Sequence, residues 1–516
     1  MTITGDPAPS PGAGIDADTA TLHSMGYAQE LRRRMGGFSN FAVSFTIISI
    51  LSGALTLYGY GLNTGGPVEM VWGWVFVGGM TTIVGLGMAE VCSAYPTAGG
   101  LYFWSARLAK RQGPAWSWFT GWFNLLGQVA VTAGIDFGFA IFFTAFLNLT
   151  TGLGATRGHT VIVYAVVLLI HGLLNTLGVR IVAFLSDVSV WWHIIGVLVI
   201  VIVLAAVPAH HASASFVFTH FVNNTGFHSS LYVVLIGLLM AQYTFTGYDA
   251  SAHMSEETKN PAIAGPKGIV NSILVSLVAG FILIIGVTYA ITNNYKSALA
   301  SSTGVPPVQI WIDALGRHGG ELLLVIAFVA QFYCGMASVT ANSRMIYAFS
   351  RDGALPASSF WHRINPRTRT PTNSIWFAAV FAFILGVPYL WSPVAYAAVT
   401  SIAVIGLYIA YVIPTLLRRL AGDRFRPGPW SLGKWSPIVG WVGVIWVVII
   451  TVLFVLPEVS PVTRDTFNYA PVAVGVVVLY AGGYWLISAR KWFKGPRAQG
   501  DEAELEAIES RLEHAE

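Results

Sequence analysis

Two long apolar spans of this chain are each interrupted near the middle by small and hydroxyl-bearing residues. Residues 38–62 contain Ser52-Gly53-Ala54, and residues 229–257 contain Phe245-Thr246-Gly247-Tyr248-Asp249. A break in a helix surrounded by lipid leaves backbone N–H and C=O groups unpaired, at a cost of roughly several kcal/mol per group. Such breaks persist where they line a cavity, and a matched pair in the two halves of a chain is typical of secondary transporters.

The two ends of a broken helix attract opposite charges. Unpaired N–H groups favour an anion, and unpaired C=O groups favour a cation. The first break is therefore expected to bind a carboxylate through the backbone of Ser52, Gly53 and Ala54. The second is expected to bind an amino group through the backbone of Phe245, Thr246 and Gly247. On this hypothesis a side chain at either glycine blocks the ligand; the alternative is that both glycines only pack helices together.

Ionisable side chains inside apolar spans are costly, so each is a candidate functional residue. They are Glu90, Asp136, His171, Asp187, His193, Asp249 and His253. His193 is expected to carry a coupling proton, because an imidazole gains and loses a proton near neutral pH; the alternative is a neutral imidazole bonded to a carbonyl. Glu90 and Asp249 lie near inner helix ends, where gating ion pairs are expected. His171 and Asn175, one helical turn apart, are expected to share a structural hydrogen bond.

The composition is that of a membrane protein. Hydrophobic residues make up 55% of the chain and charged residues 10%, whereas a soluble domain carries about 25% charged residues. A window of about 20 apolar residues marks a membrane-spanning helix. Twelve such spans are predicted, at residues 38–62, 68–94, 116–148, 160–180, 184–207, 229–257, 267–293, 320–350, 373–391, 393–417, 437–457 and 469–493. The predicted fold class is an all-α membrane protein.

Lysine and arginine concentrate in the segments on one side of these spans, as expected for the cytoplasmic side. If the N-terminus lies inside, all but four of the 28 Lys and Arg residues fall in inner segments. We therefore expect a multi-pass protein of the plasma (inner) membrane with both termini cytoplasmic. Residues 1–35 are predicted to form a disordered N-terminal tail, and residues 495–516 a C-terminal tail. The outer loop 208–228 holds four histidines, which could bind a metal but are expected to be solvated, so no metal site is predicted.

Three motifs resemble those of a known family. Segment 90–105, EVCSAYPTAGGLYFWS, resembles the loop after the second helix in the amino acid–choline transporter family, part of the amino acid–polyamine–organocation (APC) superfamily. Segment 248–261, with Glu256 and Glu257, resembles the end of the sixth helix in that superfamily. Segment 343–356 resembles the end of its eighth helix. The chain is thus identified as a bacterial amino acid permease of this group.

The resemblance implies a fold and several site residues. The fold is the five-plus-five inverted repeat of the leucine-transporter type, with repeats at 36–208 (helices 1–5) and 229–420 (helices 6–10) and peripheral helices 11–12 at 435–494. It implies that Tyr243 is a gating aromatic over the substrate, and that Gln128 and Ser338 face the pocket. It also places His193 where proton-coupled relatives carry a lysine, and where sodium-coupled relatives hold the ion.

These observations favour a permease that imports a small amino acid or amine, such as γ-aminobutyrate, with proton coupling and alternating access. A choline or ethanolamine transporter is the alternative within the class; it would need an aromatic cage and less of the amide cluster. A transporter-like nutrient receptor would need a large cytoplasmic domain, and a channel would need a ring of charges. The sequence carries no enzyme motif or phosphate loop, so no cofactor, ATP-driven step or nucleic-acid partner is expected; the partners are the substrate, the coupling ion and the lipid bilayer.

Overall fold

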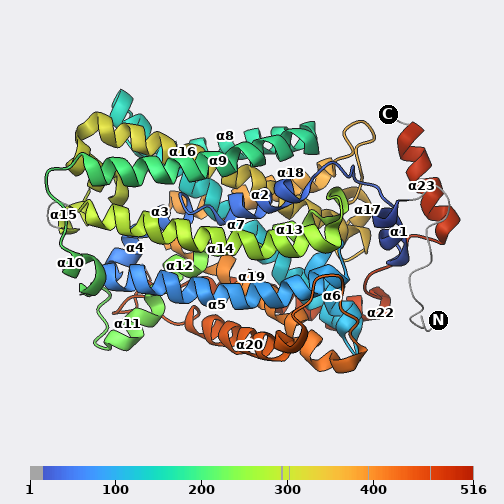
Figure 1. Ribbon diagram of the computed structural model, residues 1–516. Coiled ribbons are helices and arrows are strands. Elements are labelled where there is room, and N and C mark those ends of the chain that lie inside the picture. Colours follow the sequence, from blue (N-terminus) through green and yellow to red (C-terminus); the bar gives the residue numbers. More distant parts are fainter. Residues whose placement is uncertain (1–15, 292–294, 302, 393, 465, 515–516) are drawn as a thin grey trace.

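The computed structural model describes residues 16–514 apart from 292–294, 302, 393 and 465. Most of its helices run roughly parallel to one another as a bundle, crossed by short helices at both ends (Figure 1). The first half contains α1 (Ala17–Ser24), α2 (Gly37–Ile48), α3 (Gly53–Thr56), α4 (Tyr58–Asn63), α5 (Gly66–Ala94), α6 (Gly100–Leu108), α7 (Gly113–Thr151), α8 (Arg157–Leu177), α9 (Val179–Ala206) and α10 (Ala214–Thr219).

The second half continues the bundle. It contains α11 (Ser230–Gly237), α12 (Leu239–Thr244), α13 (Ala250–His253), η1 (Ser255–Glu257), α14 (Pro261–Tyr289), α15 (Tyr295–Leu299), α16 (Pro306–Arg351), α17 (Ser358–Trp361), α18 (Thr372–Gly386), η2 (Val387–Leu390), α19 (Val394–Ala421), η3 (Gly422–Arg424), η4 (Gly433–Trp435), α20 (Ser436–Leu453), α21 (Ala470–Tyr484), η5 (Trp485–Ala489), α22 (Arg490–Trp492) and α23 (Glu502–His514). The two-residue strands β1 (Thr64–Gly65) and β2 (Val222–Asn223) pair antiparallel between the loops at one end.

Eleven helices in the described part of the chain are long and apolar enough to cross a membrane. The predicted span 229–257 is not among them, because its apolar helix covers only Ser230–Thr244 before the backbone leaves the helical conformation. The predicted span 320–350 is part of a longer helix, α16, which begins at Pro306 and kinks at Gly316. The chain is therefore a helical, multi-span membrane protein.

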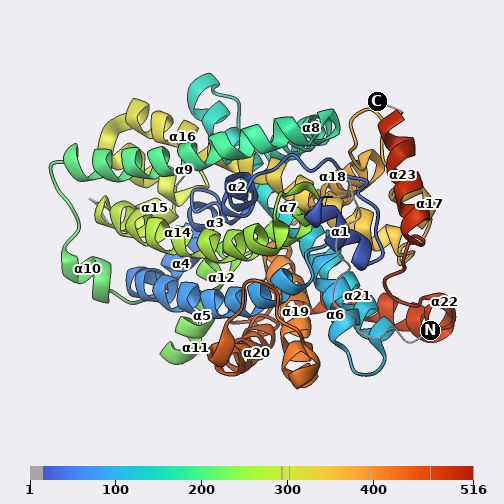
Figure 2. The ribbon, with the colours of Figure 1, turned by 45° about the vertical axis from the view of Figure 1, so that its right-hand side comes forward.

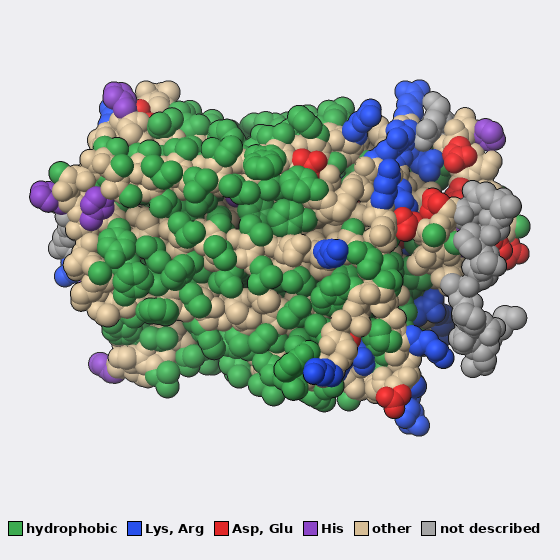
Figure 3. Space-filling model, in the orientation of Figure 1, with side chains coloured by type: hydrophobic (Ala, Val, Ile, Leu, Met, Phe, Trp, Pro, Cys, Tyr) green, Lys and Arg blue, Asp and Glu red, His purple; other side chains and the backbone are tan. Residues whose placement is uncertain are grey.

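The surface of the bundle agrees with a membrane location. Apolar side chains cover its middle, and Lys and Arg side chains gather toward the end that carries α1 and α23 (Figure 3). Many large apolar side chains of the long helices are exposed, among them Ile162 (63%), Phe184 (64%) and Leu479 (76%). Exposed apolar patches of this extent mark a surface that meets another apolar phase, here lipid.

The long helix α7 lies at the centre of the packing. It contacts α19, α16, α8 and α6, so it links helices of both halves of the chain. The broken helices enter the same core: α2 packs on α14, α9 and α16, while α12 packs on α3, α5 and α19 (Figure 2). Residues from both halves of the chain therefore meet at the two breaks.

The segment before the first span is ordered from Asp16 onward, which corrects the predicted disordered tail. Its apolar side chains Leu22, Tyr27 and Leu31 are at most 2% exposed, because they pack against the hydrophobic core at the Lys- and Arg-rich end of the bundle. The C-terminal segment holds it in place: Gln499 N donates to Gly26 O at 2.8 Å. Residues 1–15, the rest of that predicted tail, lie outside the described residues.

A carboxyl group in the loop between α20 and α21 should make folding stability depend on pH. Burial raises the pKa of Glu458 to about 7, although Ser401 donates a hydrogen bond to it at 3.1 Å. The folded state thus binds a proton that the unfolded state releases, so stability is present at low pH and falls as pH rises through 7. We expect the melting temperature to fall between pH 6 and pH 8, and Glu458→Gln to flatten that slope. An unchanged slope in the variant would assign it to other groups.

Candidate functional site

The two predicted breaks lie against each other, and a side chain of one broken helix packs against the glycine of the other. A Cβ atom on Gly53 would lie 2.6 Å from Thr244 Oγ1 and 2.9 Å from Thr244 Cα. A Cβ atom on Gly247, whose φ is +86°, would lie 2.1 Å from Ile47 Cγ2. The space beside both glycines is thus filled by protein. The expectation that a side chain there would block only a ligand is wrong, because it would first push the two helices apart.

The first break exposes a different set of amides from the predicted one. The chain turns at Ser49, whose φ of 33° is left-handed, and the N–H groups of Ser52 and Gly53 both return to Ser49 O, at 2.8 and 3.0 Å. In the described part of the chain, the N–H groups of Ile50, Leu51 and Ala54 donate to no acceptor. All three residues are at most 1% exposed, so the break does hold unpaired buried amides. Of the three predicted residues, only Ala54 contributes one.

Protein hydroxyl groups already occupy part of the second break. Tyr408 Oη donates to Phe245 O at 2.7 Å, and Thr246 Oγ1 donates to Tyr243 O at 2.7 Å. The ring of Phe245 packs on Trp74, with centroids 4.6 Å apart. A carbonyl oxygen has two lone pairs, so these contacts leave Phe245 O able to accept a second hydrogen bond.

His193 lies beside the first break, as predicted. Its Nε2 is 2.7 Å from Ser49 Oγ and its Nδ1 is 2.8 Å from Ser189 O. A carbonyl oxygen can only accept, so Nδ1 carries a hydrogen and Nε2 is the nitrogen that can gain or lose a proton. Ser49 is the left-handed residue that ends α2. A change in the protonation state of His193 thus changes the hydrogen bond made by Ser49, the residue at which the helix ends.

Asp249 is the centre of a buried polar cluster rather than of an arginine ion pair. It accepts from Gln128 Nε2 and from Tyr411 Oη, both at 2.8 Å, and lies 3.2 Å from His253 Nε2. His253 Nδ1 is 2.9 Å from Ala98 O, so it carries a hydrogen and the contact with Asp249 can hold a second proton. The cluster joins α7, α13 and α19. Gln128, which was expected to face the substrate, is engaged here.

A second buried acid–imidazole pair lies between α7 and α8. Asp136 Oδ1 and His171 Nδ1 are 2.9 Å apart, and neither side chain is exposed. The predicted structural hydrogen bond between His171 and Asn175 is confirmed: Asn175 Nδ2 donates to the backbone oxygen of His171 at 3.0 Å, and also to Met336 O at 3.2 Å. The sequence could not show the pairing of His171 with Asp136, because Asp136 lies 35 residues before His171 on another helix.

Polar side chains face one another between these clusters. Tyr243 is 4% exposed, and its hydroxyl would lie 2.6 Å from a Cβ atom on Gly134 of α7. Its hydroxyl interacts with the hydroxyl of Tyr396, and Oε1 of Gln331 has no hydrogen-bond partner within the described residues. Ser338, predicted to face the pocket, instead lies 2.9 Å from Thr132 Oγ1. Buried polar groups without partners are rare, so Gln331 is a candidate for binding a polar ligand.

Two ion pairs that the sequence analysis did not select close the end of the bundle near the termini. Glu257 binds Arg344 at 2.9 and 3.1 Å, and Glu256 binds Arg351 at 2.9 and 3.0 Å, each through two parallel hydrogen bonds. The spacing was a usable signal, since two arginines seven residues apart on α16 share one helix face. The predicted ion pairing of Glu90 is also present: Glu90 lies 3.3 Å from Arg418 Nε and 3.4 Å from Arg419 Nη2 and so joins α5 to α19, while its gating role stays a prediction.

Comparisons with known proteins decide the family. A profile described as "Amino acid permease" matches residues 35–479, which include both breaks and all the helices around them. The chain belongs to the amino acid permease family. The permease is 47% identical over 502 residues to the "Amino-acid permease BAT1" of Arabidopsis thaliana, which covers 93% of this chain and 96% of the relative.

Other relatives of the permease are also eukaryotic. It is 46% identical to the "Amino-acid permease BAT1 homolog" of Oryza sativa subsp. japonica, over 94% of this chain and 96% of the relative. It is 32% identical to the "GABA-specific permease" of Saccharomyces cerevisiae, over 95% of this chain and 88% of the relative. The prediction of an amino acid permease of the APC superfamily, and of a transporter rather than an enzyme, is confirmed. The narrower bacterial and amino acid–choline assignments stay predictions.

Proposed function

We propose that this permease imports a small amino acid or amine, such as γ-aminobutyrate, by proton-coupled alternating access across the plasma membrane. The observation that carries the proposal is the group of buried, unpaired amides at Ile50, Leu51 and Ala54, in a broken helix that crosses a second broken helix. Such amides stabilise a carboxylate, which amino acids have and choline lacks. The yeast relative named as a GABA-specific permease supports the same class of substrate.

In this proposal the fold has twelve transmembrane helices arranged as two inverted repeats of five, followed by two peripheral helices. The broken segment α11–α13 supplies the helix that falls short of a full span, between α9 and α14. Both termini lie in the cytoplasm, which is supported by the Lys and Arg side chains around α1 and α23. Alternating access would then open and close the end sealed by Glu256–Arg351 and Glu257–Arg344.

The proposed substrate lies between the breaks. Its carboxylate binds the unpaired amides of the first break, at Ile50, Leu51 and Ala54, and its amino group binds the carbonyls of Phe245, Thr246 and Gly247. Tyr243, which is buried beside Gly134 of α7, covers it. Gln128 and Ser338 act indirectly, by fixing Asp249 and Thr132. His193 carries the coupling proton, and Glu90 and Asp249 anchor the moving helix ends.

Uptake by the purified permease in liposomes tests the substrate class. We expect labelled γ-aminobutyrate to be taken up, and unlabelled amino acids to compete at concentrations at which choline does not, because only the former have a carboxylate for the amides. An imposed inward proton gradient should raise accumulation at least several-fold. Inhibition by choline alone would favour the choline or ethanolamine alternative. If accumulation instead depended on a sodium gradient, the coupling ion would be sodium and not the proton.

A further inference from the structure

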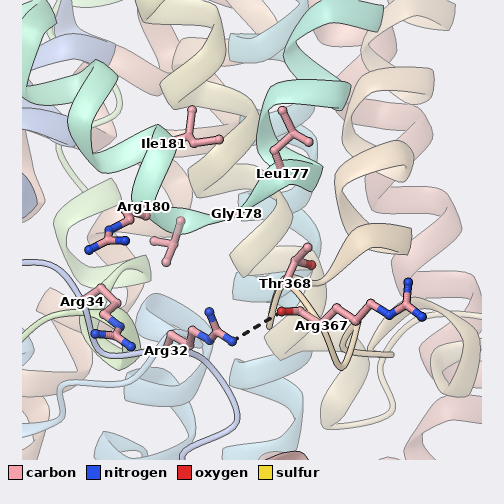
Figure 4. Close-up of a pocket in the computed structure, with 9 residues that line it drawn as sticks. Arg32, Arg34, Leu177, Gly178, Arg180, Ile181, Arg367 and Thr368 are labelled. Atoms are coloured by element: carbon pink, nitrogen blue, oxygen red, sulfur yellow. Dashed lines mark hydrogen bonds between the residues drawn. The ribbon is translucent and has the colours of Figure 1, made fainter. Parts of the chain in front are cut away.

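A cavity of about 500 Å³ opens at the corner between α8 and α9, away from the two breaks. Its walls come from three parts of the chain: the segment before α2 with Arg32 and Arg34, the α8–α9 corner with Arg180, and the loop before α18 with Arg367. Figure 4 shows Arg34 and Arg180 on one side and Arg32 between them and Arg367. This volume falls within the range of small-molecule sites, about 300–1,000 Å³.

The charge of the cavity is one-sided. Among the residues that the structure describes, four arginines line it and no carboxylate does. Arg32 Nη2 donates to Arg367 O at 3.4 Å, which holds the first wall against the third. In the described residues Arg34 and Arg180 take part in no ion pair. Arg34 and Arg180, whose guanidinium groups have no acidic partner in the described residues, repel each other across the cavity, so an anion between them relieves that repulsion, and a phosphate group can accept two hydrogen bonds from a guanidinium.

The rim of the cavity adds an apolar side. Leu177 and Ile181 line it and are 61% and 38% exposed. The exposed apolar side chains of Leu173 and Phe184 continue from them along α8 and α9, on the surface that faces lipid. A soluble anion would make no contact with these apolar side chains. A phospholipid would, because its acyl chains can lie along them while its phosphate enters between the arginines.

We propose that this cavity binds the phosphate headgroup of an anionic membrane lipid. The bound headgroup would join the segment that enters the first broken helix to the α8–α9 corner and to the loop before α18. The site is independent of the substrate site, since none of its lining residues belongs to either break.

Thermal unfolding of the full-length protein in detergent tests the proposal, with dioctanoyl phosphatidic acid as the probe. We expect this lipid to raise the melting temperature in a saturable way, and dioctanoyl phosphatidylcholine to leave it unchanged, because a ligand that binds only the folded state stabilises it. The double variant Arg34→Gln/Arg180→Gln should weaken the apparent affinity at least ten-fold. Both side chains are exposed, so its melting temperature without lipid should equal that of the wild type.

A matched control removes the same charge elsewhere. Arg363→Gln/Arg424→Gln replaces two exposed arginines near the same end that do not line the cavity, and it should respond to phosphatidic acid as the wild type does. An equal loss in both double variants would show a general charge effect and overturn the site. Inorganic phosphate distinguishes a lipid headgroup from a soluble phosphate ligand. If inorganic phosphate raised the melting temperature as much as phosphatidic acid does, the ligand would be soluble and the lipid assignment would be overturned.

Discussion

His193→Ala should abolish accumulation of substrate against its gradient while leaving downhill exchange measurable. The Nε2 atom of His193 lies 2.7 Å from Ser49 Oγ, and its other nitrogen is committed to Ser189 O. When Nε2 gains a proton it changes from acceptor to donor, so Ser49 must reverse its hydroxyl at the residue that ends α2. Protonation and the shape of the first break are thereby linked, and each favours the other by the same free energy.

Proton flux and labelled uptake in liposomes measure this directly. We expect the variant to show no rise in accumulation with an inward proton gradient, and His193→Lys to keep coupling with a shifted pH optimum. His253→Ala is the matched comparison, because it removes a buried imidazole at the second break, 3.2 Å from Asp249. If His253→Ala loses concentrative uptake and His193→Ala keeps it, coupling belongs to the Asp249 cluster at the second break.

The presence of both breaks was predictable because glycine and hydroxyl residues inside an apolar span weaken a helix locally. The second break lies where it was predicted, after Thr244, whereas the first begins earlier than the predicted Ser52, because α2 ends at Ile48 and Gly53 already belongs to α3. The position of His193 beside the first break was implied by the family resemblance. For the breaks, the signal lay within a few turns of the residues concerned.

The partners of these residues were not predictable, since they depend on how distant helices cross. Thr244 fills the space beside Gly53 from 191 residues away in the chain, and Ile47 fills the space beside Gly247. The same holds for Asp136 with His171 and for Asp249 with Gln128. The predicted disordered tail failed for a related reason: a polar, alanine-rich segment carries little signal of its own, and its order comes from burial of Tyr27 and Leu31 against the bundle.

Gly247→Ala should strongly reduce the amount of folded protein, and Ile47→Ala should restore part of it. The new methyl group would meet Ile47 Cγ2 at 2.1 Å, and the φ of +86° is left-handed. Overpacking in a core costs about 1–3 kcal/mol, and a left-handed residue with a Cβ atom costs about 1–2 kcal/mol. Removing the Ile47 side chain relieves the first of these costs and not the second, so the rescue should be partial.

Melting temperature and folded yield of the two single variants and the double variant measure this coupling. Gly79→Ala is the control, because Gly79 lies within helix α5 and a Cβ atom there meets nothing within 4 Å; it should melt at or above the wild-type temperature. If Gly247→Ala instead melted like the wild type but lost uptake, the glycine would serve the approach of the ligand. If Gly247→Ala lowered the melting temperature and the added Ile47→Ala raised it again, Gly247 would serve the close contact of the two broken helices. Any site between these helices depends on that contact.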